Sequence, residues 1–180
     1  MRGMVFSEFL DFVEAAAGPD MVDDMLDSCD LDSGGAYTSV GNYDHGEIVK
    51  MVTFLNEATG NDVSQMVHDF GQHLFGQLAK SHKSVIGDET GLLNFLEGIE
   101  THIHKEVRKL YPDAELPVFD TERVDDHNLI MKYQSSRPFA DLAHGMISGA
   151  SDHFNKTITV KREDLPSNGV FSTKFHVKIS

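Results

Sequence analysis

The sequence contains a single cysteine and no tryptophan. One cysteine, Cys29, cannot form an internal disulfide and excludes a zinc site built from several cysteines. We expect this thiol to be structural and at least partly buried. So little cysteine also suits a reducing compartment, and the sequence therefore predicts a cytoplasmic protein.

Basic residues are also few, and long apolar runs are absent. Fifteen Lys and Arg stand against 29 Asp and Glu, which gives a net charge of −14. This excess opposes binding to a phosphate backbone, so we expect no nucleic-acid partner. It favours solubility or a basic protein partner. No segment approaches the ~20 apolar residues of a membrane span. Glu8, Asp11 and Glu14 interrupt the N-terminal apolar segment, unlike a signal peptide.

The length and the apolar content predict one well-packed domain. A chain of 180 residues buries about 70% of the surface that it would expose when unfolded. Its 12 Phe and 8 Met residues suit an ordinary core and would equally suit a roomy apolar pocket. Repeats, low-complexity segments and long linkers are missing, so we expect residues 1–180 to form a single domain that could contain two lobes.

Apolar residues recur at intervals of three and four over the first two thirds of the chain, which predicts helices. Asp20, Asp44 and Asn61 are suitable N-caps, and Gly60 is suited to end a helix. The predicted helices cover residues 4–18, 19–29, 44–60, 61–80 and 91–111.

The period changes after Pro112. Residues 170–180 alternate between apolar and polar side chains, which indicates a half-buried strand. Residues 156–163 form a second strand that turn-forming residues connect to the first, and residues 127–137 form a third. One helix, residues 139–155, lies between them. The order of these elements predicts an α+β fold with a small antiparallel sheet.

Ten histidines raise the question of a metal site. Each residue of an α-helix turns by about 100°, so His102 and His104 lie about 200° apart and cannot bind one ion together. Both flank an apolar stripe that is centred on Ile103. Helical geometry alone does not choose between them, and each could be a boundary residue. The stripe consists of Leu92, Leu96, Ile99, Ile103, Val107 and Leu110.

The segment KYQSSR places Tyr133, Ser135 and Arg137 two residues apart. In an extended chain the three side chains share one face and span about 13 Å. An exposed strand face would explain them, but a guanidinium with two hydroxyl groups also suits carboxylates. A lone histidine with such a carboxylate clamp fits heme b, an iron with two propionates that binds without covalent attachment.

Several motifs together resemble the heme nitric oxide/oxygen binding (H-NOX) family, the bacterial relatives of the heme domain of soluble guanylate cyclase. They are MRG at the start, FGQHLF, IHKEVRKLYP, ELP and YQSSR. The resemblance implies a helical distal lobe and a proximal lobe with a four-stranded antiparallel sheet, with heme between them. It also implies that His104 is the axial ligand, that Pro117 distorts the heme and that Tyr133, Ser135 and Arg137 hold the propionates.

The resemblance also indicates which gases bind. Oxygen-binding members carry a distal tyrosine five residues after the arginine of the motif, where this chain has Leu142. The other distal positions, Val5, Phe9 and Leu74, are apolar as well. His73 and His144 would each face about 100° away from the neighbouring pocket residue. We therefore expect binding of NO and CO without a stable oxygen complex.

The resemblance implies signalling to a separate protein, either a sensor histidine kinase or a cyclic-di-GMP synthase or phosphodiesterase. Gly71 and Gly145 could be points of flexure or sites of close helix packing. Some relatives carry a C-terminal zinc site, which the lack of cysteine after Cys29 rules out. The alternatives are an oxygen-binding or redox-sensing protein of the same fold, a heme enzyme and a heme-free interaction module. We expect no enzymatic activity, because no distal acid or base is well placed.

Overall fold

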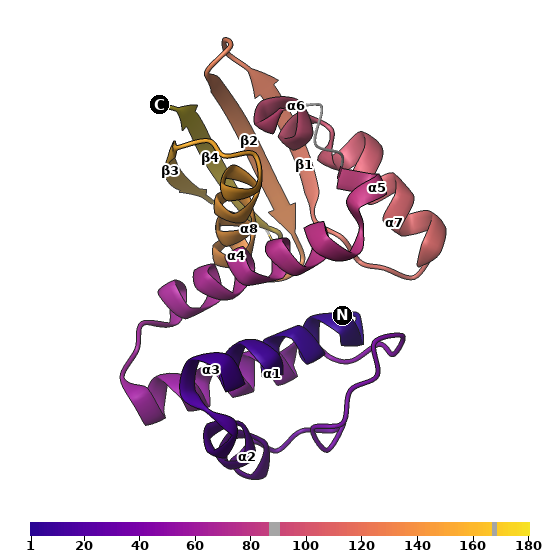
Figure 1. The fold of residues 1–180 in the computed structure, drawn as a ribbon, viewed down its shortest axis with the longest axis vertical. Helices are drawn as coiled ribbons and strands as arrows, with labels where there is room; N and C mark the ends of the chain where they lie inside the picture. The colour runs from indigo at the N-terminus through magenta and orange to yellow at the C-terminus, as the bar shows by residue number, and fades with distance from the viewer. Residues whose placement is uncertain (87–90, 167–168) are drawn as a thin grey trace. The chain divides into compact units, whose positions relative to one another are not determined.

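The computed structural model describes residues 1–86, 91–166 and 169–180. The chain divides into two compact units, Met1–Phe70 and Gly71–Ser180. The division falls inside the helix α4 (Val63–Ser81), which is labelled in Figure 1. A helix rather than a linker connects the units, which explains why composition along the chain gives no sign of a boundary.

The first unit is helical and closely follows the predicted elements. Phe6, Phe9 and Val13 lie on one face of the first helix and are buried. Gly18 ends this helix with a φ of 89°, a conformation that glycine adopts without a steric cost. Gly60 ends the third helix with a φ of 72°, as predicted. The helices are α1 (Gly3–Ala17), α2 (Pro19–Ser28), α3 (Gly46–Thr59) and the first part of α4.

The predicted N-caps of α2 and α4 are wrong by one or two residues. Helix α2 begins at Pro19 after Gly18, so Asp20 lies within its first turn. Proline is favoured at this first position because its missing N–H would have no partner there anyway. At α4 the carboxylate of Asp62, not the side chain of Asn61, accepts the N–H of Gln65 at 2.8 Å.

The N-cap predicted for α3 is also displaced by one residue. His45 occupies that position and makes no capping bond with its side chain. Asp44 nevertheless serves the helix start, because its carboxylate accepts the N–H of Gly46 at 2.6 Å. The acidic side chain thus satisfies one of the free amides at the helix N-terminus.

A buried carboxylate organises the loop between α2 and α3. Glu47 is 4% exposed, and it accepts the N–H of Ser33 at 3.1 Å, its hydroxyl at 2.5 Å and the hydroxyl of Tyr37 at 2.6 Å. Burial and the bond to Glu47 raise the pKa of Tyr37, so this hydroxyl stays a donor. These three donors offset the cost of burying the carboxylate.

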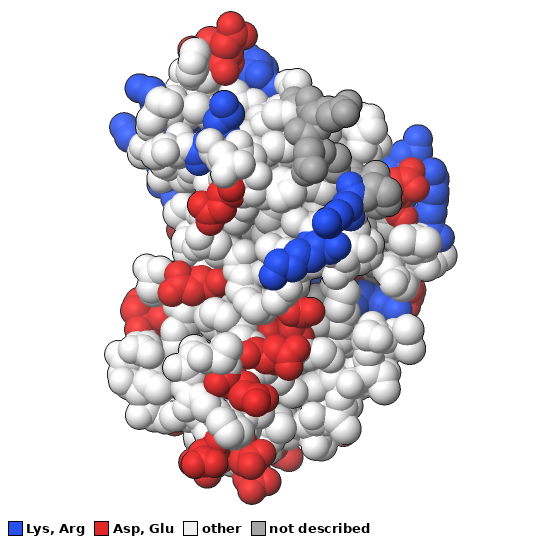
Figure 2. Space-filling model, in the orientation of Figure 1, with Lys and Arg blue, Asp and Glu red and all other residues white. Residues whose placement is uncertain are grey.

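The negative charge is concentrated in the first unit. Residues 1–70 contain fourteen Asp and Glu but only Arg2 and Lys50 as basic residues. Twelve of the fourteen net negative charges therefore lie in this unit. Acidic side chains predominate over it on the face that Figure 2 shows.

The second unit combines short helices with a sheet, which confirms the α+β prediction. The four strands are antiparallel in the order β1-β2-β4-β3, and α6 and α8 cover the same face of the sheet (Figure 1). The first strand was expected only from the family resemblance, and α5 was not expected. The elements are α5 (Lys83–Ile86), α6 (Leu92–Glu97), η1 (Ile99–Ile103), α7 (His104–Leu110), β1 (Val118–Arg123), β2 (Asn128–Ser135), α8 (Ala140–His153), β3 (Ile158–Leu165) and β4 (Phe171–Ile179).

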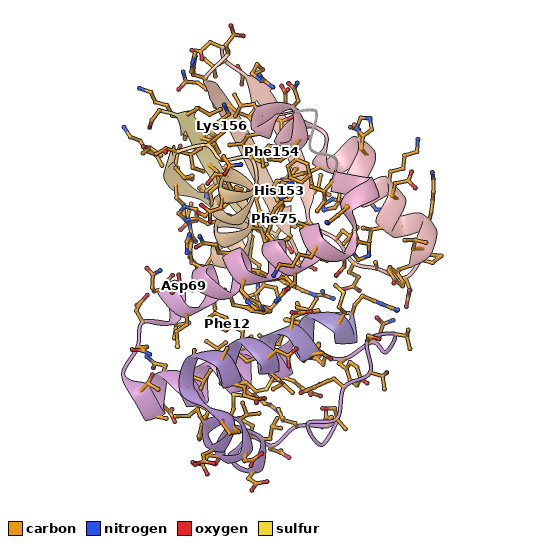
Figure 3. All side chains as sticks on the ribbon, viewed as in Figure 1. Phe12, Asp69, Phe75, His153, Phe154 and Lys156 are labelled. Atoms are coloured by element: carbon orange, nitrogen blue, oxygen red, sulfur yellow. The ribbon has the colours of Figure 1, made fainter. Side chains whose placement is uncertain are left out.

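The core of this unit lies between the sheet and its helices. Alternate residues of β2 and β4 point into it, and only Phe171 of the apolar face of β4 is substantially exposed, at the start of the strand. Aromatic side chains from α4, α6 and the end of α8 meet on the helical side. Phe75 contacts Phe95 at 5.7 Å between ring centroids, and Phe95 contacts Phe154 at 5.5 Å. Figure 3 labels Phe75 and Phe154.

Glycines allow α4 and α8 to pack backbone against backbone. A Cβ atom on Gly71 would lie 2.4 Å from the carbonyl oxygen of Leu142 and 3.1 Å from the Cα of Gly145. A Cβ on Gly149 would lie 2.8 Å from the Cβ of Phe75. The close-packing role considered for Gly71 and Gly145 is therefore observed.

Two alanine substitutions should have opposite effects on stability. Gly149→Ala forces a methyl group against α4, and such overpacking costs about 1–3 kcal/mol. Gly76→Ala, the control on α4, has open space around the added methyl and should stabilise by about 0.5–1 kcal/mol through helix propensity. The free energy of unfolding in urea measures both, and an equally stable Gly149→Ala protein would contradict the packing.

Candidate functional site

The helix that carries the histidines is not a continuous α-helix. The N–H of His104 donates to the carbonyl oxygen of Ile99, and that of Ile103 to Gly98 at 3.4 Å. Both bonds span five residues, which defines a π-helical turn, η1, a feature that often occurs at functional sites. The extra residue in this turn rotates the side chains that follow it about the helix axis, relative to their positions in a regular α-helix.

This rotation changes the predicted apolar stripe and decides between the two histidines. Leu110, predicted to lie on the stripe, is 62% exposed. His102 is exposed, whereas His104 is 9% exposed and belongs to the buried polar residues. The uniform 100° turn per residue was the wrong assumption. The structure therefore turns His104 inward and leaves His102 in solvent.

A carboxylate fixes the tautomer of His104. Nδ1 of His104 lies 2.9 Å from Oε2 of Glu100, one turn earlier. An ionised carboxylate only accepts hydrogen bonds, so the proton sits on Nδ1 and Nε2 keeps its lone pair. Burial lowers the pKa of His104, although Glu100 acts in the opposite direction. The ring is thus held in the neutral form that binds a metal ion.

Three donors surround the carboxylate of Glu100. Besides His104, it accepts Nη2 of Arg108 at 2.9 Å and the backbone N–H of Phe119 at 3.4 Å. Burial tends to raise the pKa of Glu100, but the bonds from His104 and Arg108 outweigh it and the pKa is lowered. The carboxylate therefore stays ionised beside the histidine.

Ring contacts lead from His104 to the sheet. The centroids of His104 and Phe119 lie 6.0 Å apart, and those of Phe119 and Tyr133 lie 5.7 Å apart. Phe119 of β1 pairs directly with Tyr133 of β2. Sequence reasoning missed both Glu100 and Phe119. The four-residue interval between Glu100 and His104 was a usable signal for the first, whereas the second lies in a strand that the residues did not indicate.

Tyr133, Ser135 and Arg137 lie together, but not in the extended row that was predicted. Strand β2 ends at Ser135, and the N–H of Arg137 turns back to the hydroxyl of Ser135 at 3.0 Å. Such bonds from a hydroxyl to the local backbone compete with a strand ladder. The hydroxyl of Tyr133 donates to the carbonyl oxygen of Arg137 at 3.3 Å. The bend therefore gathers all three at one strand end.

The guanidinium of Arg137 already engages a carboxylate. It forms an ion pair with Glu115, and the Arg137 side chain is 14% exposed against 70% for Glu115. A largely exposed partner is readily exchanged for another carboxylate. Burial raises the pKa of Tyr133, so its phenol remains a donor. Pro117 is half-buried and directly precedes β1.

The distal positions expected from the resemblance carry apolar side chains on three helices. Phe9 on α1 is buried edge-to-face against Phe70, and Val5 on the same helix is half-buried. Leu74 on α4 is buried, and Leu142 on α8 is half-buried.

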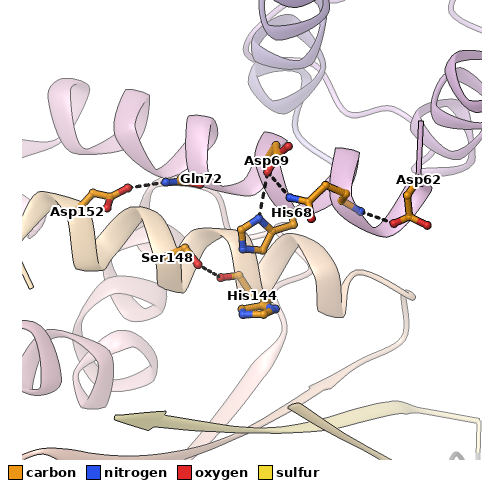
Figure 4. Close-up of polar contacts among 8 residues, drawn as sticks. Asp62, His68, Asp69, Gln72, His144, Ser148 and Asp152 are labelled. Atoms are coloured by element: carbon orange, nitrogen blue, oxygen red, sulfur yellow. Dashed lines mark hydrogen bonds and ion pairs between the residues drawn. The ribbon is translucent and has the colours of Figure 1, made fainter. Parts of the chain in front are cut away.

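The polar side chains considered as distal donors have other contacts. The ring of His144 packs at 5.8 Å against Phe175 of β4, and the Nε2 of His73 lies 3.5 Å from the Gln77 amide nitrogen on its own helix. Figure 4 shows His144 on α8, where its carbonyl accepts the hydroxyl of Ser148. The hydroxyl of Tyr37 is bonded to Glu47.

The described residues offer neither a second metal site nor a membrane-spanning helix. Within residues 1–86, 91–166 and 169–180, no group of three or more His, Cys, Asp and Glu could hold a metal ion. None of the helices described is long and apolar enough to cross a membrane.

The donor set fits heme. A neutral buried imidazole with Nε2 available is the usual protein ligand of heme iron. A guanidinium and two hydroxyl groups at the adjacent strand end suit the propionates. His104 would be the ligand, while Tyr133, Ser135 and Arg137 would bind the carboxylates.

Comparisons with known proteins identify the family of this chain. A family model described as haem-NO-binding matches residues 2–162. No curated protein sequence matches the chain. The unliganded Fe(II) H-NOX protein of K. algicida is 33% identical, with a TM-score of 0.93, over all of this chain and 97% of that one.

Two further structures share the fold over all of this chain. The Fe(II)NO H-NOX protein of S. oneidensis is 25% identical, with a TM-score of 0.89 and 99% of its chain covered. A mutant of the T. tengcongensis H-NOX protein is 23% identical, with a TM-score of 0.90 and 98% of its chain covered. The family-model match and the likeness to the K. algicida protein show that this chain belongs to the H-NOX family of heme-binding gas sensors.

Proposed function

We propose that this protein is a sensor without enzymatic activity that binds NO and CO at ferrous heme b, forms no stable oxygen complex and signals in the cytoplasm to a separate protein. A bound heme would supply an iron with one coordination position for a diatomic gas. The observation that carries the proposal is the buried neutral ring of His104, whose Nδ1 is committed to Glu100 and whose Nε2 is available.

The strand end would hold the cofactor without a covalent bond. We assign the propionates to Tyr133, Ser135 and Arg137, because Arg137 already pairs with the exposed carboxylate of Glu115. A bidentate guanidinium contact adds geometric selectivity to the attraction. Pro117, which directly precedes β1, would press against the ring and distort it.

Selectivity against oxygen would come from the apolar distal side chains of Val5, Phe9, Leu74 and Leu142. Oxygen on ferrous iron accumulates negative charge and gains from a hydrogen-bond donor, whereas NO depends on one much less. A hydrogen bond to a charged group contributes roughly 1.5–3 kcal/mol, which is about ten- to more than a hundredfold in affinity. Four aliphatic and aromatic side chains provide no such bond.

The signal would begin with the bond from His104. NO bound to the heme would weaken the bond between His104 and the iron, and the helix that carries His104 would then be released. The partner would be a sensor histidine kinase or a cyclic-di-GMP synthase or phosphodiesterase.

Visible spectra of the reduced protein test the gas selectivity. With heme supplied during expression, we expect NO and CO each to shift the absorption of the ferrous protein. Air should produce no persistent oxygen complex, because the side chains at the four distal positions carry no hydrogen-bond donor. A stable oxygen spectrum would favour an oxygen-binding protein of the same fold, and a colourless protein would favour a heme-free interaction module.

Leu142→Tyr should introduce oxygen binding. A phenol at this position of α8 provides the missing donor, and we expect oxygen affinity to rise about ten- to a hundredfold. Leu142→Phe is the matched control, because it adds the ring without the hydroxyl. Oxygen titration of the two ferrous variants separates hydrogen bonding from size, and equal affinities would argue against the selectivity mechanism.

His104→Gly should lose heme and recover it with added imidazole. The free imidazole restores an axial nitrogen but does not connect it to α7, so partner output should no longer respond to NO. Heme content and partner activity are measured with and without NO. An intact NO response in the imidazole-loaded variant would refute signalling through the histidine helix.

A further inference from the structure

We propose that Glu100 is a positioning residue that sets the strength of the bond between His104 and the iron, and with it how readily NO releases His104. This inference rests on the proposed role of His104 as the axial ligand. It adds a residue that the motifs of the sequence did not indicate.

The contact has the geometry of a fixed carboxylate–histidine pair. Oε2 of Glu100 lies 2.9 Å from Nδ1 of His104, and the two side chains are 27% and 11% exposed. A surface ion pair between long, mobile side chains contributes little. Here the imidazole is buried at the end of a π-helical turn, and its Nδ1 points toward the carboxylate of Glu100.

Three elements hold the carboxylate in place. Glu100 lies on η1, its Oε1 accepts from Arg108 on α7, and its Oε2 accepts from the backbone of Phe119 on β1. The contact from β1 comes from the main chain of a strand and does not depend on a rotamer. Glu100 is thus bound both to the helix that carries His104 and to the sheet beside it.

The chemical consequence follows from the proton on Nδ1. A carboxylate that accepts this proton in a hydrogen bond increases the electron density of the ring and makes Nε2 a stronger donor to iron. The bond to His104 is then harder for NO to break. Weakening the acceptor should therefore lower the strength of that bond and favour release.

Glu100→Gln tests this directly, because it removes the charge and keeps the shape. In the ferrous protein, the iron–histidine stretching band in the resonance Raman spectrum should move to lower frequency, and the reduction potential should rise. The rate of heme transfer to an acceptor protein should increase roughly tenfold. With NO, a larger fraction should lack the bond to His104.

Glu106→Gln is the matched control. Glu106 lies on α7, the helix that begins at His104, and pairs with Lys109 at 2.6 Å. Its substitution removes one negative charge, as Glu100→Gln does, but leaves the contact of His104 unchanged. We expect its Raman band and potential to equal those of the unaltered protein. Equal bands and potentials for Glu100→Gln would overturn the inference, and a downward shift of the same size in Glu106→Gln would show a general charge effect and overturn it as well.

A second measurement tests the inference even if the Glu100→Gln protein with His104 in place folds poorly. In the His104→Gly protein, imidazole can donate to Glu100 and 1-methylimidazole cannot, so we expect imidazole to bind the heme about tenfold more tightly. This preference should become smaller in His104→Gly with Glu100→Gln, because the amide oxygen is a weaker acceptor than the carboxylate. A preference of unchanged size is steric and overturns the inference.

The outcomes also separate this inference from the function that it deepens. A ferrous protein without any iron–histidine band would overturn the axial role of His104, and the role of Glu100 with it. A normal band that Glu100→Gln does not move would overturn the role of Glu100 alone.

Discussion

The site depends on one irregular turn of backbone. In η1 the amides of Ile103 and His104 reach five residues back instead of four, and this rotation brings His104 out of the shoulder position that a regular helix would give it. A π-turn is less favourable than an α-turn, so its neighbours must stabilise it. The bonds from Arg108 and Phe119 to Glu100 provide that support and at the same time fix the histidine.

The sequence predicted most of the fold because its periodic segments agree with their environment. The helices over residues 4–18, 44–60 and 61–80 and the strand over residues 170–180 lie within a few residues of those observed, since hydrophobic spacing and the conformation of Gly60 dictate them locally. The N-caps were misplaced by one or two residues because short polar side chains can serve neighbouring positions equally well. Strand β1 has an exposed, mixed pattern and owes its conformation to pairing with β2.

The site was predictable in its residue types but not in its geometry. The motifs of the family resemblance led to His104, Tyr133, Ser135 and Arg137. The last three lie together at the end of β2, and Phe119 lies between the rings of Tyr133 and His104. The prediction of an extended row was wrong at Arg137. There the backbone N–H donates to the hydroxyl of Ser135 two residues earlier, and this bond ends the strand β2. Neither the π-turn nor the triple contact of Glu100 follows from periodicity. The π-turn depends on backbone bonds that reach five residues back, and the contacts of Glu100 involve side chains of α7 and the backbone of β1.

The charge of the first unit has a consequence for how that unit responds to its surroundings. Like charges stand one turn apart on α2, in the pairs Asp20–Asp24 and Asp23–Asp27, and the two members of each pair repel each other. The helix α2 contains no basic side chain. Only packing, such as that of the fully buried Met25, opposes the repulsion. Counterions shorten the range of such repulsion to about 8 Å at physiological ionic strength. The stability of the first unit should therefore increase as salt is added, whereas that of the nearly neutral second unit should change little.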